Sequence, residues 1–211
     1  MKLMSRRALL GIAIAVGCGG GALSAPLASS DPDLSREALL DDPQTPVGGD
    51  PKGDVTIVSF FDYNCPYCMK AQPELLKLLE ADKHIRVVYK DWPIFGDISV
   101  FAAKVALAAN LQGKYVAVHD ALMATARKKT TEAQVRQIAL AAGADIERLD
   151  ADLAAHSAEI DAILKRTDKQ ATAMGFESTP VFLIGPFLVA AALDLPGFQK
   201  AVSDARERQK P

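Results

Sequence analysis

Two cysteines, Cys65 and Cys68, stand where an apolar stretch of the chain gives way to a helical pattern. The stretch before them, VTIVSFFDY (55–63), is almost continuously apolar and rich in β-branched and aromatic side chains, which predicts a strand covered on both faces. The residues after them (69–82) space their leucines as a helix does, and a second strand pattern follows at 85–93. This strand-helix-strand unit predicts two parallel strands joined by a right-handed crossover.

The rest of the chain completes one α/β domain. From about 99 to 176 it is rich in alanine and helical in period, which predicts a helical insertion. The segment TPVFLIGPFLVAA (179–191) predicts two short strands, and a helix should follow at about 195–208. With 211 residues and 49% hydrophobic content the chain can bury one core. We place the domain at 48–211, after a lead-in segment at 25–47.

The N-terminus has the layout of a secretory signal peptide, which we place at 1–24. A cationic start is followed by a short apolar run and then by small residues. The arginine pair at 6–7 resembles the twin-arginine signal, so the Sec and twin-arginine routes are both open. Cys18 follows a segment similar to that before the lipid-modified cysteine of bacterial lipoproteins, and a lipid anchor there is the alternative to its removal. Either route predicts a protein of the periplasm or cell envelope, where disulfides persist.

The cysteine pair suits zinc and haem poorly. Structural zinc needs four ligands, whereas the chain offers one further cysteine and three histidines in separate parts of the sequence. Covalent haem attachment needs a histidine directly after the second cysteine, where this chain has Met69. A Cu(I) site made by Cys65, Cys68 and Met69 stays open, because soft ligands suit that ion. A permanently closed staple is the other alternative, although so short a loop adds little stability.

Redox chemistry fits the location of the pair better than these alternatives do. A thiol at a helix N-terminus faces unpaired backbone N–H groups and the positive end of the helix dipole, which favour the thiolate. Cys65 is therefore the expected nucleophile. Cys68 lies one turn further on and is expected to resolve the mixed disulfide, while Pro66 and Tyr67 hold the turn between them.

Motifs far apart in the sequence resemble one family. The segments FFDYNCPYC and STPVFLIG, with the helical insertion between them, are similar to the thioredoxin-fold, DsbA-like thiol:disulfide oxidoreductases. The resemblance covers about 38–206. The segments REALLDDP and GKYVAVHDALM are similar to an exported branch related to Com-type and copper-tolerance, ScsC-like proteins. The resemblance implies an α/β class protein: a thioredoxin fold with a helical insertion.

The resemblance also implies roles for residues beyond the cysteines. In the family a cis-proline loop faces the dithiol and pairs with an extended client chain, and Thr179-Pro180 matches that loop. A trans-proline that opens a strand is the alternative, and Ser178 stands where many relatives have glycine. Ser59 stands six residues before the first cysteine, where many thioredoxin-fold proteins have a buried acid that relays a proton. Whether Asp62 substitutes for that acid is left open by the sequence.

Other polar residues are expected to have structural roles. His119 lies among apolar residues, which favours packing or a local hydrogen bond over catalysis. Trp92 and the pair at 60–61 are expected in the core. The basic run at 127–129 is typical of a solvated helix face. The formal net charge of −2 gives no reason to expect nucleic-acid binding.

These features predict an exported oxidoreductase that introduces disulfides into secreted proteins by dithiol-disulfide exchange, without a bound cofactor. The expected partners are reduced or unfolded exported proteins and a membrane redox partner that recycles the dithiol. A reductase or isomerase of the same fold and a Cu(I)-binding thiol protein are the alternatives. Because the lead-in is too short for a stable coiled coil, we expect a monomer.

Overall fold

A computed structural model describes residues 31–125 and 128–210 of the chain. The expected signal peptide at 1–24, with Cys18, lies outside these residues. Within the part that is described, no helix is both long and apolar enough to cross a membrane.

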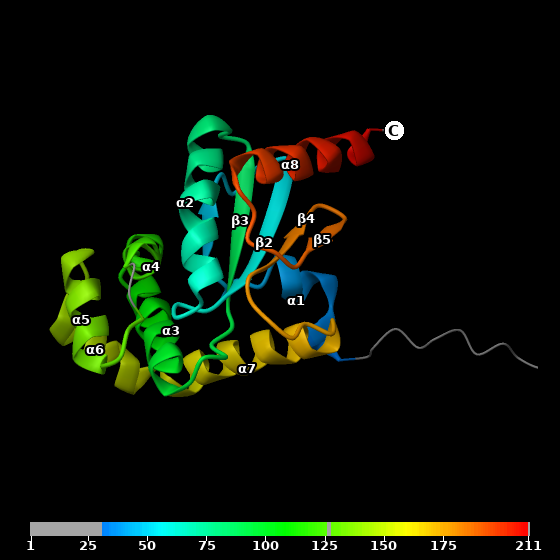
Figure 1. The fold of residues 1–211 in the computed structure, drawn as a ribbon. Coiled ribbons are helices and arrows are strands. Elements are labelled where there is room, and N and C mark those ends of the chain that lie inside the picture. The colour runs from blue at the N-terminus through cyan, green and yellow to red at the C-terminus, as the bar shows by residue number, and fades with distance from the viewer. Residues whose placement is uncertain (1–30, 126–127, 211) are drawn as a thin grey trace, which may run out of the picture. The chain divides into compact units, whose positions relative to one another are not determined.

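A five-stranded mixed sheet forms the centre of the domain, with the strand order β1-β3-β2-β4-β5. Figure 1 labels β2 to β5 of this sheet. The central strand β2 pairs in parallel with β3 and antiparallel with β4, as the strand-helix-strand pattern predicts for the first pair. The first strand, β1, pairs antiparallel with β3 and was not expected, because its short glycine-rich sequence carries no strand pattern. The strands are β1 Val47–Gly49, β2 Val55–Phe61, β3 Ile85–Asp91, β4 Val181–Ile184 and β5 Phe187–Val189.

Helices occupy the connections that the sequence predicts. One helix joins β2 to β3, five form the insertion between β3 and β4, and one closes the described chain. These are α2 Pro66–Ala81, then α3 Asp97–Asn110, α4 Tyr115–Ala124, α5 Glu132–Ala141, α6 Ile146–Ala155 and α7 Ser157–Ala173, and finally α8 Leu195–Gln209.

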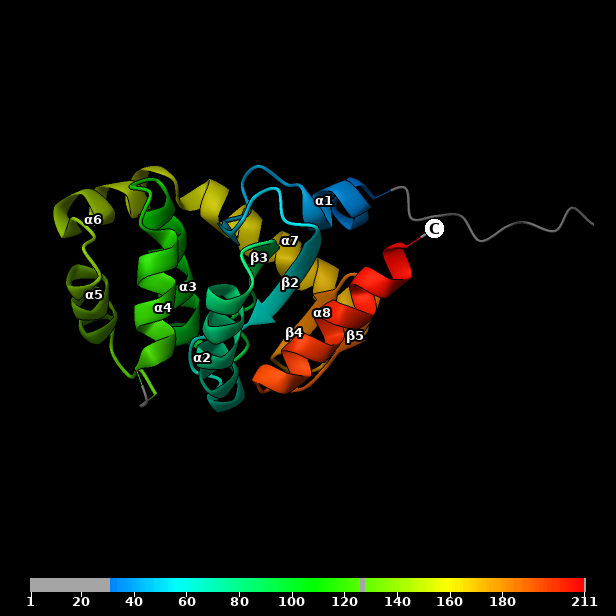
Figure 2. The same cartoon turned by 90° about the horizontal axis from the view of Figure 1, so that it is seen from above.

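The sheet is covered by helices on both faces, with α2 and α8 on one side and α1 (Arg36–Leu40) and α7 on the other (Figure 2). Side chains alternate along β2, so Ile57 and Phe61 join the core under α2 while Val58 and Phe60 join the core under α7. Burial on both faces explains why the strand is almost continuously apolar.

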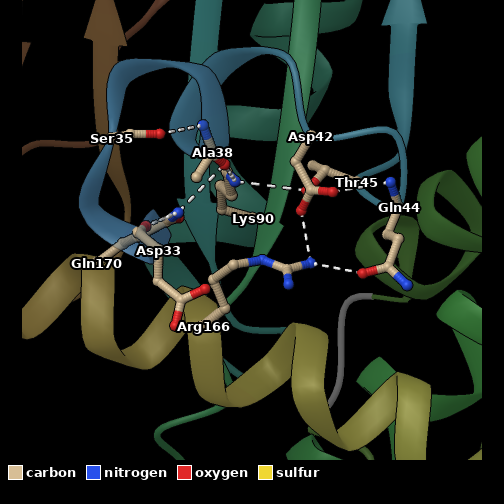
Figure 3. A network of polar contacts seen from close by, with 9 residues as sticks. All are labelled: Asp33, Ser35, Ala38, Asp42, Gln44, Thr45, Lys90, Arg166 and Gln170. Atoms are coloured by element: carbon tan, nitrogen blue, oxygen red, sulfur yellow. Dashed lines mark hydrogen bonds and ion pairs between the residues drawn. The ribbon is translucent and has the colours of Figure 1, made fainter. Parts of the chain in front are cut away.

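The N-terminal part of the described chain is fastened to this second face (Figure 3). The ammonium group of Lys90, on β3, donates to the carbonyl of Ala38 at 3.1 Å, and the side-chain amide of Gln170, on α7, donates to the same carbonyl at 3.2 Å. Arg166 of α7 forms an ion pair of 2.6 Å with Asp42. Much of the expected lead-in segment is therefore packed against the domain.

Candidate active site

Cys65 is the N-cap residue of α2. Strand β2 ends at Phe61, and a tight turn in which the N–H of Cys65 donates to the carbonyl of Asp62 leads into the helix. Cys65 keeps extended backbone angles (φ −79°, ψ 117°), and Pro66 occupies the first helical position, where a missing N–H costs nothing. The sulfur is thereby placed over the unpaired N–H groups of the first turn.

The two thiols have unequal surroundings. Both are reduced and buried, with side chains 1% and 3% exposed for Cys65 and Cys68. The backbone N–H of Cys68 donates to the Sγ atom of Cys65 at 3.4 Å. A hydrogen bond from the Cys68 thiol lowers the pKa of Cys65 to about 6, although burial of Cys65 acts in the opposite direction. Burial, and then the neighbouring Cys65 sulfur, raises the pKa of Cys68 above its ordinary value.

The loop before β4 faces Cys65 from the other side. The thiol of Cys65 donates to the carbonyl oxygen of Thr179 at 3.2 Å, and the Thr179–Pro180 peptide bond is cis. The hydroxyl oxygen of Thr179 is buried and has no hydrogen-bond partner among the described residues. The Thr179 side chain, after the Cys68 thiol, helps to lower the pKa of Cys65. The fold thus joins two motifs that are far apart in the sequence.

Asp62 fixes the backbone in front of the cysteines. Its carboxylate accepts from the N–H of Asn64 at 2.6 Å and from the Ser99 hydroxyl at 2.7 Å. It also accepts from the N–H groups of Ile94 and Phe95, at 2.7 and 2.9 Å. Asp62 therefore ties the redox loop (62–65) to the loop before α3, and these bonds give the carboxylate a structural role.

A second buried carboxyl group of this region lies on the neighbouring strand. Ser59 is buried and lies on the same face of β2 as Ile57 and Phe61. Asp91, which pairs in register with Phe61, ends β3 and accepts a 2.6 Å hydrogen bond from Tyr115. Burial raises the pKa of Asp91 to about 7. Sequence reasoning missed Asp91 because the register of β2 against β3 is not visible in the sequence.

His119 packs in the core near this carboxyl group. Its Nδ1 atom lies 3.1 Å from the hydroxyl of Tyr63, and its ring stacks on that of Tyr115. Burial lowers the pKa of His119 to about 3, so the ring is neutral at physiological pH. These contacts support the expected packing role. Trp92 is also buried, as expected, and its indole N–H donates to Asp168 at 3.0 Å.

Residue 127 of the basic run at 127–129 lies outside the described residues, and the other two do not lie on the solvated helix face that the composition indicates. Lys128 is exposed, but Lys129 is completely buried and lies in the loop between α4 and α5. Its ammonium group donates to the carbonyl of Tyr63 at 2.6 Å. The composition of the run was misleading because burial of a single lysine depends on tertiary contacts that no local pattern reports.

Apolar side chains near the dithiol are exposed. Tyr67, between the two cysteines, is 64% exposed, while Ile94 and Phe95 are 39% and 43% exposed. The backbone N–H groups of the latter two are bound by Asp62, which places them beside the redox loop. Among the described residues, no group of three or more His, Cys, Asp or Glu side chains could hold a metal ion.

Comparison with known proteins settles the family. The profile described as thioredoxin matches residues 41–204, more than three quarters of the chain. The chain belongs to the thioredoxin family. A thioredoxin-like oxidoreductase from Silicibacter pomeroyi DSS-3 is 44% identical and superimposes with a TM-score of 0.77 over 82% of this chain and 98% of that one.

Two further solved members of the family have the same fold. A periplasmic thioredoxin-like protein from Salmonella enterica serovar Typhimurium is 27% identical, with a TM-score of 0.68 over 80% of this chain and 94% of that one. The thiol-disulfide exchange protein α-DsbA2 from Wolbachia pipientis is 24% identical, with a TM-score of 0.75 over 82% of this chain and 93% of that one. The thioredoxin fold of this chain, with its helical insertion, is therefore DsbA-like.

The chain also matches short parts of much longer proteins. A Na⁺/H⁺ antiporter, NhaA 1 of Salinispora arenicola, is 36% identical over 110 residues, which are 51% of this chain and 16% of the antiporter. NhaA 3 of Salinispora tropica is 32% identical over 101 residues, 46% of this chain and 15% of that protein. The chain thus matches about a sixth of the length of these relatives.

Proposed function

We propose that the protein is an exported thiol-disulfide oxidoreductase that introduces disulfides into other exported proteins. The observation that carries the proposal is the asymmetry of the dithiol. Cys65 caps α2 and receives the N–H of Cys68, whereas the Cys68 thiol is enclosed and its pKa is raised. Such a pair has one thiol that ionises near neutral pH and one that stays protonated until it is needed.

The exchange proceeds through one mixed disulfide. A client thiolate attacks the Cys65 sulfur of the oxidised protein, the bond between Cys65 and Cys68 breaks, and Cys68 leaves with the electron pair and takes up a proton. A second client thiolate then attacks the client sulfur of the mixed disulfide and releases Cys65 as a thiolate. The client loses two electrons and two protons; the protein gains the two electrons, Cys68 takes up one proton, and the other goes to the solvent.

Oxidation of clients is the favoured direction. The pKa of about 6 at Cys65 means that the reduced protein holds a stabilised thiolate at neutral pH. Stabilising the reduced form makes the couple a stronger oxidant. Each turnover leaves Cys65 and Cys68 reduced. A membrane redox partner then has to accept the two electrons and restore the disulfide.

Four further residues complete the site: Pro180 in a catalytic role, and Pro66, Tyr67 and Thr179 in supporting roles. Pro66 starts α2 and Tyr67 separates the cysteines, so both set the position of the Cys65 sulfur. Pro180 follows Thr179, whose carbonyl oxygen accepts a hydrogen bond from the Cys65 thiol. We place the protein in the periplasm or cell envelope, in keeping with the N-terminal signal pattern and with the periplasmic relative from Salmonella.

Equilibration with glutathione and two ribonuclease assays test this function. The protein should oxidise reduced ribonuclease quickly and unscramble mispaired ribonuclease slowly. Cys65→Ser should abolish both reactions, whereas Cys68→Ser should retain one reactive thiol and accumulate mixed disulfides. A strongly reducing couple, or efficient unscrambling with slow oxidation, would overturn the assignment in favour of a reductase or an isomerase.

Alkylation of the reduced protein tests the assignment of the two thiols. Iodoacetamide should label Cys65 first, with a pH dependence near 6, because the Cys68 thiol holds its proton more tightly. Peptide mapping identifies the labelled residue. Preferential labelling of Cys68 would contradict the proposed mechanism.

A further inference from the structure

Lys129 brings a cation from the helical insertion to the redox loop. The residue lies between α4 and α5, and its side chain is completely buried. Its ammonium group donates to the carbonyl of Tyr63 at 2.6 Å and lies 3.8 Å from the Sδ atom of Met69. Tyr63 stands two residues before Cys65, and Met69 directly follows Cys68.

The backbone of Lys129 is held at the same place. Its N–H donates to the Oδ1 atom of Asn64 at 2.8 Å, and the Nδ2 atom of Asn64 donates back to its carbonyl at 3.2 Å. Asn64 directly precedes Cys65. This reciprocal pair and the contacts of the ammonium group all involve residues within two positions of a cysteine, so one residue of the insertion is fitted against both sides of the dithiol sequence.

The charge of Lys129 is not neutralised by a direct ion pair. Among the residues that the structure describes, no carboxylate lies within ion-pair distance of its ammonium group. The charged group that faces it is Asp62, which acts on it through space, while burial lowers its pKa to about 8. Asp62 is itself engaged with the N–H groups of Asn64, Ile94 and Phe95. Burying an ammonium group costs free energy, and here the buried charge is hydrogen-bonded to the carbonyl of Tyr63, two residues before Cys65.

We propose that Lys129 is a positioning residue of the dithiol, whose buried cation stabilises the Cys65 thiolate while its backbone holds the redox loop in place through Asn64. The inference rests on the proposed exchange function and deepens it. An opposite charge near a thiol favours its ionised form. The insertion, and not the thioredoxin sheet alone, therefore sets how strongly oxidising the dithiol is.

Two substitutions of Lys129 test the charge. Lys129→Met removes the charge and keeps the apolar stem, while Lys129→Gln removes the charge but keeps a donor that can reach the carbonyl of Tyr63. Both should raise the pKa of Cys65 by about one unit and shift the equilibrium with glutathione up to about tenfold toward the disulfide form. Lys128→Met, at the exposed neighbouring position, is the matched control and should leave both quantities unchanged.

Asn64→Ala separates the backbone tie from the charge. The substitution removes the reciprocal hydrogen bonds of Asn64 but keeps the ammonium group of Lys129. It should therefore slow thiol-disulfide exchange, and it should change the pKa of Cys65 less than Lys129→Gln does. Folded Lys129→Met and Lys129→Gln variants with the wild-type pKa and wild-type equilibrium would overturn the proposal.

The unmodified protein provides a measurement that does not depend on the folding of a variant. Coupling between two sites is reciprocal, so the pKa of Lys129 should be higher in the reduced protein, which holds the thiolate, than in the disulfide form. The Cε resonance of Lys129, followed by NMR against pH, reports this difference, and equal values would overturn the proposal. Failure of the wild-type protein to exchange with glutathione would instead remove the proposed function, and the pKa comparison would still decide the role of Lys129.

Discussion

The hydroxyl of Tyr115 donates a 2.6 Å hydrogen bond to the Oδ2 atom of Asp91 in the buried cluster under the redox loop. The other carboxyl oxygen of Asp91 has no partner among the described residues. Tyr63 and His119 belong to the same cluster, and Asp62 adds a negative charge from the end of β2. Burial raises the pKa of Asp91 to about 7 against the effect of the Tyr115 hydrogen bond, so the carboxyl group keeps its proton up to about neutral pH.

Asp91 should make the protein less stable as the pH rises. Its pKa is raised on folding from 3.8 to about 7, so the native state binds the proton more tightly than the unfolded state between these values. Relative to Asp91→Asn, the wild-type protein should lose about 4 kcal/mol of stability from pH 4 to pH 8, at about 1.4 kcal/mol for each unit. Urea unfolding of both proteins across this range measures the difference, and parallel curves would contradict it.

His119 should act in the opposite direction. Its pKa falls on folding from 6.5 to about 3, so the unfolded state binds the proton more tightly and the wild-type protein loses stability as the pH falls through this range. His119→Gln should remove this loss. Because the two effects oppose each other between about pH 4 and pH 6.5, the slopes of the two single variants there should differ from that of the wild-type protein in opposite directions. The pKa of Cys65 should be unchanged in His119→Gln, and a large change would indicate a part in the chemistry.

Thr179→Val should raise the pKa of Cys65 by about one unit, because the hydroxyl group is lost as a donor to the thiolate while the carbonyl and the side-chain shape are kept. Alkylation rates against pH measure the shift. Ser178→Ala changes an exposed hydroxyl one residue earlier and is the control. Equal shifts in both variants would show that the loop, and not the Thr179 hydroxyl, is responsible.

The redox centre could be predicted from the sequence more completely than its surroundings. The motif around Cys65 and Cys68 is local, since the strand, the N-cap and the helix are consecutive in the chain, and the family motif identified the loop at Thr179. Asp91 and Lys129 gave no such signal. Their burial results from strand register and from a loop of the insertion, and both are set by contacts between distant parts of the chain.

The mature protein should be a monomer that oxidises reduced clients well and unscrambles mispaired clients poorly. The described N-terminal segment is held by its own domain, through the contacts of Lys90 and Gln170 with Ala38 and the ion pair between Arg166 and Asp42 (Figure 3). A segment occupied in this way is not available as a stalk that gathers several active sites around one client. Light scattering on the exported form measures its mass, and a stable trimer with strong unscrambling activity would contradict both parts.

The helical insertion leaves the sheet after β3 and returns at β4, and both of these strands pair with β2, the strand that leads into Cys65. Its sequence can therefore diverge without breaking the hydrogen-bond ladder that carries the cysteines. At the same time, loops at its two ends and in its middle reach the redox loop through Phe95, Thr179 and Lys129. Substitutions in the insertion can therefore change the surroundings of the two cysteines without altering the strand that carries them.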